Sequence, residues 1–396
     1  MTYKTCLIAL LVASVPACTI VEADDTGTGG GAAGGGGGGG GGLEPCETIV
    51  TARVTEPTTW SCETVRIERG ILVEAPLQIE PGVTVRFEQG TDLTIQPGAS
   101  LNAVGTADAP IELVGDQATK GFWSGLTFLS ASPDNRLEHV RIRHTGAEGY
   151  QFGTHALYVG GDATTAAFLA LQDVDIAEAS GLGLASTSGG VIESAGVSYA
   201  NIDDFPIEVA SNQLHLIDAA SSFGDGLGKP WIRARRSSME TSETWLAHEI
   251  PYRFEGDRHR IENGDAVITV EAGARLEFEQ DASFEVYEGG LSAVGSSDAP
   301  IVFTGLEPVK GYWAGIIFLS ASASNELDYA QISYAGDESG YQFQEYCVGA
   351  FQDANLTVTN SYFGFCANTA ILAHEDASLT FGNNSFEGND AELTTW

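Results

Sequence analysis

A short spacing that recurs in two separate parts of the chain restricts the possible fold more than any other feature. Leu356-Thr357-Val358 returns as Leu379-Thr380-Phe381, and Val174-Asp175-Ile176 returns as Val197-Ser198-Tyr199, with the same offset in both cases. Periods of 20 to 50 residues are typical of solenoids, in which each repeat buries its apolar face against the next repeat. The spacing therefore predicts a solenoid with about 23 residues per turn.

A longer repeat contains the short one. Residues Gly121–Gly146 and Gly311–Gly336 are identical at 12 of 26 positions without a gap. The duplication predicts two similar halves, residues 43–225 and 226–396, stacked into one rod. Two explanations remain open for it, a duplicated structural element and a duplicated catalytic site.

The repeat unit has the pattern of short strands. Val83, Val85 and Phe87 alternate with polar residues, and Pro81-Gly82 precedes them as a turn signal. Alternation at every second position marks a strand with one buried face. These features predict an all-β protein, a parallel β-helix of about 15 coils for about 350 residues.

Particular strings in both halves resemble one family, the bacterial right-handed parallel β-helix repeat surface lipoproteins. The first half contains Gly-Val-Thr-Val-Arg-Phe (82–87), Leu-Asn-Ala-Val-Gly-Thr (101–106), Ala-Pro-Ile (109–111) and Gly-Phe-Trp-Ser-Gly (121–125). The second half contains Leu-Ser-Ala-Val-Gly (291–295), Ala-Pro-Ile (299–301) and Gly-Tyr-Trp-Ala-Gly (311–315). The resemblance implies a right-handed parallel β-helix. It implies no particular chemistry, because the fold hosts lyases, hydrolases, adhesins and plain spacers.

The N-terminus has the form of a lipoprotein signal. Lys4 precedes an apolar run, and Val15-Pro16-Ala17-Cys18 resembles a bacterial lipobox. We expect residues 1–17 to be removed and Cys18 to carry lipid; the alternative is an ordinary signal peptide with an incidental Cys18. Residues 18–42 are expected to form a flexible tether, because they end in an unbroken run of glycines from 34 to 42. The expected location is extracytoplasmic, at the outer membrane or cell surface.

Charge narrows the possible partners. The chain has 54 acidic and 18 basic residues, a net charge of −36. Such an excess repels nucleic acid and anionic lipid headgroups, so nucleic acid is excluded as a partner. The expected partners are the membrane, through the N-terminal lipid, and a polysaccharide or another surface protein.

Four cysteines follow Cys18 and form two pairs that are local in sequence. Cys46 and Cys62 are separated by less than one predicted coil, and so are Cys347 and Cys366. In an oxidising compartment this locality predicts the disulfides Cys46–Cys62 and Cys347–Cys366. A zinc site is the alternative, although neither spacing contains a Cys-x₂-Cys knuckle.

The duplicated segments also repeat an aromatic pattern. In the structural interpretation, Trp123 and Trp313 cover the apolar edge of a coil and the aliphatic residues after them enter the core. In the functional interpretation, exposed aromatic side chains form platforms that bind a ligand. The candidates for such platforms are Trp123, Tyr150, Phe152, Trp313, Tyr341 and Phe343.

One polar constellation is expected where coils stack in the first half. The outward residues His139, Arg141 and Arg143 would lie beside Asp173 and Asp175. Polysaccharide lyases on this fold use such groups, with carboxylates holding Ca²⁺ and a basic residue abstracting a proton. The alternative is a ladder of ion pairs between coils, which contributes little stability per pair. The second half replaces the three basic residues with Tyr329, Gln331 and Ser333.

A basic cluster, Arg233, Arg235 and Arg236, lies between the two halves. It is expected to neutralise nearby carboxylates, and the alternative is that it docks an acidic partner. These features predict a surface-anchored β-helix with a structural or binding role, in which glycan binding and adhesion are the binding roles considered. No cofactor is expected for that role. The alternative is a polysaccharide-active lyase or hydrolase, with Ca²⁺ as a possible cofactor.

Overall fold

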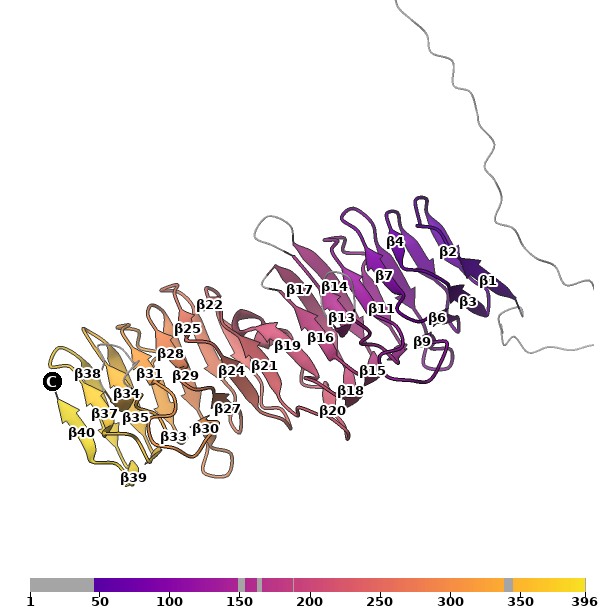
Figure 1. Cartoon of the computed structure of the whole chain (residues 1–396). Coiled ribbons are helices and arrows are strands. Elements are labelled where there is room, and N and C mark those ends of the chain that lie inside the picture. Colours follow the sequence, from indigo (N-terminus) through magenta and orange to yellow (C-terminus); the bar gives the residue numbers. More distant parts are fainter. Residues whose placement is uncertain (1–45, 149–153, 162–165, 188, 338–344, 396) are drawn as a thin grey trace, which may run out of the picture. The chain divides into compact units, whose positions relative to one another are not determined.

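The structure is a computed structural model that describes residues 46–148, 154–161, 166–187, 189–337 and 345–395. These residues belong to one compact unit, Leu43–Trp396. The unit is a parallel β-helix of short strands, as predicted, and every pairing between its described strands is parallel (Figure 1).

Consecutive strands along the chain lie in different sheets, and each strand pairs with strands one coil away. Three sheets begin in the first half. Sheet A contains β1 (Glu47–Val50), β3 (Thr64–Ile67), β6 (Thr84–Phe87), β9 (Ile111–Gly115), β12 (Val140–Arg143), β15 (Asp175–Ala179), β18 (Ser198–Ile202) and β20 (Ser222–Phe223). Sheet C contains β2 (Thr58–Trp60), β5 (Leu77–Ile79), β8 (Leu101–Val104), β11 (Arg136–Glu138), β14 (Ala167–Gln172) and β17 (Gly190–Ala195). Sheet B contains β4 (Ile71–Val73), β7 (Asp92–Ile95), β10 (Gly125–Phe128), β13 (His155–Val159), β16 (Leu182–Ser186), β19 (Ile207–Ala210), β21 (Ile232–Arg235), β24 (Tyr252–Glu255), β27 (Arg275–Phe278), β30 (Ile301–Gly305), β33 (Ala330–Ser333), β36 (Tyr362–Gly364) and β39 (Ser385–Glu387).

Two further sheets belong to the second half. Sheet D contains β22 (Ser238–Met239), β25 (Arg258–Ile261), β28 (Ser283–Val286), β31 (Gly315–Phe318), β34 (Tyr346–Ala350), β37 (Thr369–Ala373) and β40 (Ala391–Thr395). Sheet E contains β23 (Glu243–Trp245), β26 (Val267–Val270), β29 (Gly290–Val294), β32 (Glu326–Asp328), β35 (Asn355–Thr359) and β38 (Ser378–Gly382). A 3₁₀ helix, η1 (Ser211–Leu216), follows β19 at the junction of the halves.

Sheet B alone runs through both halves among the described strands, with 13 strands. The sequence predicted about 15 coils because it assumed a constant period. Coil length in fact varies along sheet B: Ile232 has Tyr252 as its register partner in the next coil, whereas Leu93 has the much more distant Leu126. The longer coils carry loops between their strands, so the same length of chain makes fewer coils.

The duplicated segments occupy different sheets in the two halves. Strand β9 lies in sheet A, and its equivalent β30 lies in sheet B. Strand β10 lies in sheet B, and its equivalent β31 lies in sheet D. The second copy is therefore displaced by one strand position within the coil. Sheet B consequently contains different strands of the repeat in the two halves.

The core of sheet B is one unbroken column of apolar side chains. Register partners along it contribute one inward residue per strand, in the order Ile71, Leu93, Leu126, Leu157, Leu184, Ile207, Ile232, Tyr252, Leu276, Phe303, Ile332, Phe363 and Phe386. All but Phe386 are buried. Burial of each large aliphatic side chain stabilises the fold by about 1.5–3 kcal/mol relative to exposure.

Both repeated tryptophans lie inside the core. The Trp123 ring stacks on Phe87 with a centroid distance of 3.8 Å, and the Trp313 ring stacks on Phe278 at 4.1 Å. The Trp123 Nε1–H donates to the carbonyl oxygen of Arg143 at 2.6 Å, and the Trp313 Nε1–H donates to that of Ser333 at 2.9 Å. The polar atom of each buried indole is therefore satisfied.

The glycine two residues after each tryptophan is required by the backbone. Gly125 has a φ of 103° and Gly315 a φ of 105°, in the region that favours glycine. A Cβ atom at Gly125 would lie 2.2 Å from the carbonyl oxygen of His155, and one at Gly315 would lie 2.6 Å from that of Cys347. The repeated Trp-x-Gly pattern is thus explained by packing alone.

A buried histidine makes the core sensitive to acid. His259, on β25, is fully buried, and its ring lies edge-on to Phe254 with a centroid distance of 4.9 Å. Its Nε2 lies 3.1 Å from the carbonyl oxygen of Glu255, so Nε2 carries the proton, and Nδ1 has no partner among the described residues. Burial lowers the pKa of His259 to about 4; the Glu255 carbonyl and Asp257 oppose this shift weakly, and Arg236 adds to it.

We expect Trp123→Ala and Trp313→Ala to destabilise the protein by similar amounts, about 3–5 kcal/mol each, because each removes a stacked core indole and leaves a cavity. Denaturant unfolding followed by far-UV circular dichroism measures this. Val294→Ala, at a 41% exposed side chain, is the control and should change stability little. A loss below about 1 kcal/mol in either tryptophan variant would contradict the packing described.

We expect His259→Gln to reduce the loss of stability on acidification. The folded-state pKa lies below the unfolded value of about 6.5, so the unfolded state binds more protons and stability falls as pH falls from about 6.5 toward 4, by up to about 3 kcal/mol. Thermal melts between pH 7 and 4 measure the difference between wild type and variant. The half-exposed His139→Gln is the control. Parallel pH profiles for wild type and His259→Gln would disprove the role of His259.

Candidate functional site

The predicted polar constellation lies on the outward face of sheet A. Val140 and Ile142 of β12 point into the core, which leaves His139, Arg141 and Arg143 on the outside. The parallel register places Arg141 opposite Asp175 of β15. The stacking that the sequence predicted is therefore present.

The charges of this face pair with one another across coils. The two terminal nitrogens of Arg143 donate to the two carboxylate oxygens of Asp175, at 3.2 and 2.6 Å. Arg141 instead donates to Glu112 of β9 at 2.8 Å. Strand β12 is thus tied to the coil on each side by a different arginine.

The pairing fixes the protonation of Arg143. Burial lowers the pKa of Arg143, but the hydrogen bond and charge of Asp175 outweigh it and raise the pKa above its usual value. The guanidinium therefore stays charged and cannot abstract a proton from a substrate. This arrangement matches the ladder of ion pairs, one of the two interpretations that the sequence left open.

Histidines occupy the two corners that flank β12. His139 Nε2 lies 3.7 Å from Asp173, and His144 Nε2 lies 2.8 Å from Glu178. All four residues have a positive φ, between 49° and 66°, which marks the left-handed corners of a coil. Sequence reasoning missed the His144–Glu178 pair, although the two pairs have the same separation along the chain, which could have revealed it.

The equivalent face in the second half is uncharged at these positions. Tyr329, Gln331 and Ser333 take the places of the basic residues, and the corner residue Tyr334 stacks on Phe365 with a centroid distance of 5.5 Å. The duplication therefore preserved the core of this element while its outward face changed.

The basic cluster at the junction is neutralised, as predicted. Arg233 pairs with Glu208 at 2.7 Å and also with Glu255; Arg235 pairs with Glu208 at 3.2 Å, and Arg236 pairs with Asp257 at 3.2 Å. Two arginines also lie over aromatic rings. The Arg253 guanidinium lies 3.3 Å from the centroid of Trp231, and that of Arg233 lies 4.8 Å from Phe205. These contacts tie β19, β21 and β24 together on the outside of sheet B.

The aromatic platforms are not formed by the tryptophans. Trp123 and Trp313 are both 0% exposed, so they offer no surface to a ligand. The prediction that they cover an apolar edge is also imprecise, because they lie within the core. Tyr150, Phe152, Tyr341 and Phe343 lie outside the described residues, and so does Cys18.

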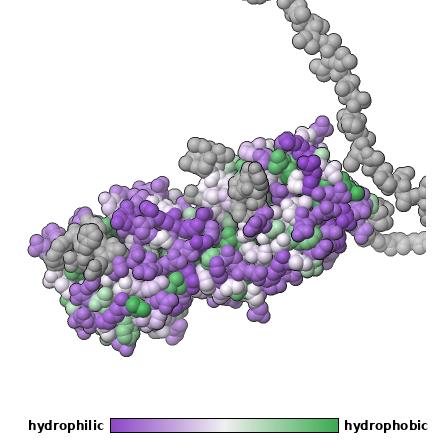
Figure 2. Space-filling model, viewed as in Figure 1, coloured by the Kyte–Doolittle hydropathy of each residue, from purple (hydrophilic) through white to green (hydrophobic). Residues whose placement is uncertain are grey.

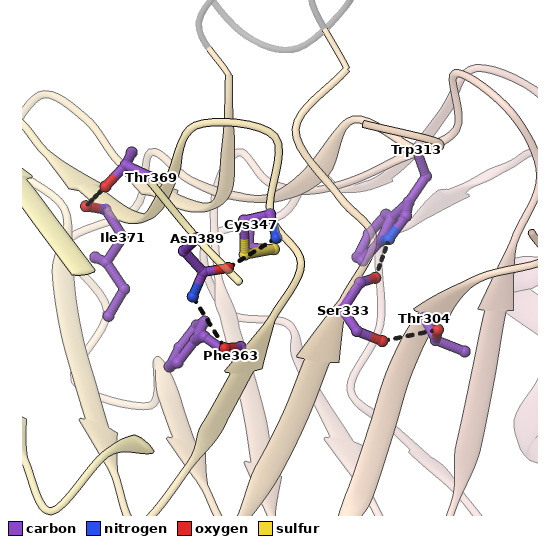
Figure 3. Close-up of a disulfide and its surroundings, with 9 residues drawn as sticks. Thr304, Trp313, Ser333, Cys347, Phe363, Thr369, Ile371 and Asn389 are labelled. Carbon is purple, nitrogen blue, oxygen red and sulfur yellow. Dashed lines mark hydrogen bonds between the residues drawn. A yellow bond between two sulfur atoms is a disulfide. The ribbon is translucent and has the colours of Figure 1, made fainter. Parts of the chain in front are cut away.

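Both predicted disulfides are present. Cys46 and Cys62 have a Cα–Cα distance of 5.1 Å, and Cys347 and Cys366 one of 5.4 Å. Asn389 supports the second bridge by accepting from the Cys366 N–H at 2.8 Å and donating to the carbonyl oxygen of Phe363 at 3.0 Å (Figure 3). The sulfur atoms are therefore not available for the alternative zinc site. Two disulfides indicate an oxidising, extracytoplasmic compartment.

The part of the chain that the structure describes contains no group of three or more histidine, cysteine, aspartate or glutamate side chains placed to hold a metal ion. Within the same residues, no helix is long and apolar enough to cross a membrane. No family model, no curated protein and no solved structure matches this chain.

We expect the Arg143–Asp175 pair to contribute about 1 kcal/mol or less to stability, because both side chains are partly exposed and solvent screens the pair. A double-mutant cycle of Arg143→Ala and Asp175→Ala, measured by denaturant unfolding, gives the coupling free energy. The matched control is the cycle of Arg141→Ala and Glu112→Ala. A coupling above about 3 kcal/mol would show that the pair acts as a buried ion pair instead.

Proposed function

We propose that the protein is a membrane-tethered extracytoplasmic lipoprotein whose β-helix serves as a rigid scaffold that displays binding surface for a polysaccharide or another surface protein. The lipobox-like sequence at Cys18 and the glycine run from 34 to 42 support the tether. The disulfides and the parallel coils support a stable folded body at the end of that tether.

The observation that carries this proposal is that the outward charged side chains pair with one another. Among the described residues, 15 arginine and lysine side chains each lie within 4.0 Å of a carboxylate oxygen. Most of these pairs join neighbouring coils, as Arg233 joins β21 to β19 and β24. Charges arranged in this way stiffen the surface, whereas an active site requires groups that converge on a substrate.

The visible surface agrees with a soluble scaffold. The face seen in Figure 2 is mostly hydrophilic, with hydrophobic residues scattered across it. Large exposed hydrophobic side chains are spread along the described chain and include Ile49, Val191, Tyr287 and Val309. Scattered apolar residues are ordinary on a soluble protein and do not mark a large hydrophobic interface.

A glycan array, run with and without Ca²⁺ and paired with an assay for newly formed reducing ends, tests the proposed binding role. We expect the purified folded body to bind glycans without releasing reducing ends. Reducing ends released by the wild type, and lost in Arg141→Ala, would establish the polysaccharide-active enzyme in place of the scaffold.

We expect Cys18→Ala to release the protein from membranes. Two or more acyl chains, at about 0.8 kcal/mol per buried CH₂, anchor a protein stably in a membrane. The variant lacks the cysteine that would carry these chains, so it loses its attachment to the membrane. Phase partitioning in detergent measures the change, and Cys6→Ala, within the expected signal peptide, is the control. Unchanged partitioning of Cys18→Ala would contradict the lipid anchor.

A further inference from the structure

One half-buried arginine is an exception to the pairing of charges. Among the described arginines and lysines, only Arg69 and Arg86 form no ion pair or hydrogen bond through their side chains. Arg69 is exposed beside the turn before β4, where water solvates it. Arg86 is half-buried on the outward face of β6 in sheet A. An unpaired, partly desolvated cation in a chain with 54 acidic residues calls for an explanation.

Arg86 lines a surface hollow of about 360 Å³ between the outer face of sheet A and the loop after β9. Its other lining residues include Thr84, Glu112, Asp116, Ala118 and His144. Its two carboxylates are held by other arginines: Glu112 by Arg141 at 2.8 Å and Asp116 by Arg66 at 3.3 Å. The Nδ1 atom of His144 is buried and has no partner among the described residues.

The strand register adds a second, independent sign of an anion site. Arg66 of β3 and Arg86 of β6 lie directly opposite each other in the parallel ladder. Like charges in directly opposite positions are destabilising. Glu47 and Asp116 compensate Arg66, at 3.1 and 3.3 Å. The second arginine of the pair remains without a counter-charge, and a bound anion would supply one.

The position of Arg86 is occupied by a different, paired residue in the second half. The stacks of Phe87 on Trp123 and of Phe278 on Trp313 align β6 with β27, so that Glu277 takes the place of Arg86. Glu277 is paired with Arg253 at 3.2 Å and with Arg275 at 2.9 Å. Tyr334 takes the place of His144. The duplicate face is therefore internally neutralised where the first face keeps a free cation.

We propose that this hollow binds a single carboxylate on a hydroxylated carrier, a sugar-acid unit, with Arg86 as the residue that binds the carboxylate. The proposal deepens the binding role proposed above and rests on it. An arginine fork matches a carboxylate geometrically. The oxygens of Glu112 and Asp116 can accept hydrogen bonds from hydroxyl groups on the same ligand. A ligand with one charge is favoured because the net charge of −36 repels polyanions.

Saturation-transfer NMR with the folded wild-type protein tests this, using glucuronate, glucose and acetate as probes at low salt. We expect glucuronate to bind, glucose and acetate to bind at least tenfold more weakly, and Arg86→Gln to weaken glucuronate binding at least tenfold. Arg69→Gln removes the same charge from the other unpaired arginine and should leave glucuronate binding unchanged. A melting temperature of Arg86→Gln no lower than that of the wild type shows that the variant is folded.

Several results would overturn the proposal. Glucuronate binding that Arg86→Gln does not change would place the ligand elsewhere. Equal binding of acetate and glucuronate would reduce the site to a simple anion site, and binding of a short acidic peptide in preference to glucuronate would replace the sugar acid with a protein partner. Absence of glucuronate binding would reject this site while leaving the scaffold role to the glycan array.

Discussion

The parallel backbone hydrogen-bond ladder of sheet B is the constraint on which the rest of the structure depends. It links 13 strands from β4 to β39 and passes through the junction, where sheets A and C end and sheets D and E begin. Because register fixes which side chains face inward, a single ladder sets both the apolar column of the core and the charged pairs outside it. The contacts of Glu208, Arg233 and Glu255 exist because β19, β21 and β24 are held in this register.

The internal duplication separates what the fold requires from what it permits. Both copies keep the stacked tryptophan, its satisfied Nε1–H and the glycine with positive φ. Outside the core the copies differ, with His144 and Glu178 in one and Tyr334 and Phe365 in the other. Since the copies lie on different sheets, these contacts between neighbouring coils do not need a particular sheet.

The sequence predicted the features that depend on local pattern. Alternation and the short recurring spacing predicted the parallel β-helix, and register pairs such as Ile176 with Tyr199 have that spacing. Locality in sequence was enough to predict both disulfides. The stacking of Arg141 over Asp175 also followed from strand order alone.

The remaining features depend on coil length, which a constant period does not provide. Arg141 pairs with Glu112, 29 residues earlier, because the coil between them is longer than the predicted period. The displacement of the second copy by one strand position arises at the junction, where η1 instead of a sheet C strand lies between β19 and β20. The left-handed corners at His144 and Glu178 were missed because positive φ is usually signalled by glycine. The depth of Trp123 was missed because glycines on both sides suggested an edge position.

Continuity of sheet B implies that the two halves of the duplication form one cooperative body. Differential scanning calorimetry of the mature chain tests this directly, with Trp123→Ala in the first half and Trp313→Ala in the second half as probes. The account predicts a single heat-absorption peak that either substitution shifts as a whole, because neighbouring coils are coupled through the ladder. Two separable peaks, each moved only by the substitution in its own half, would contradict it.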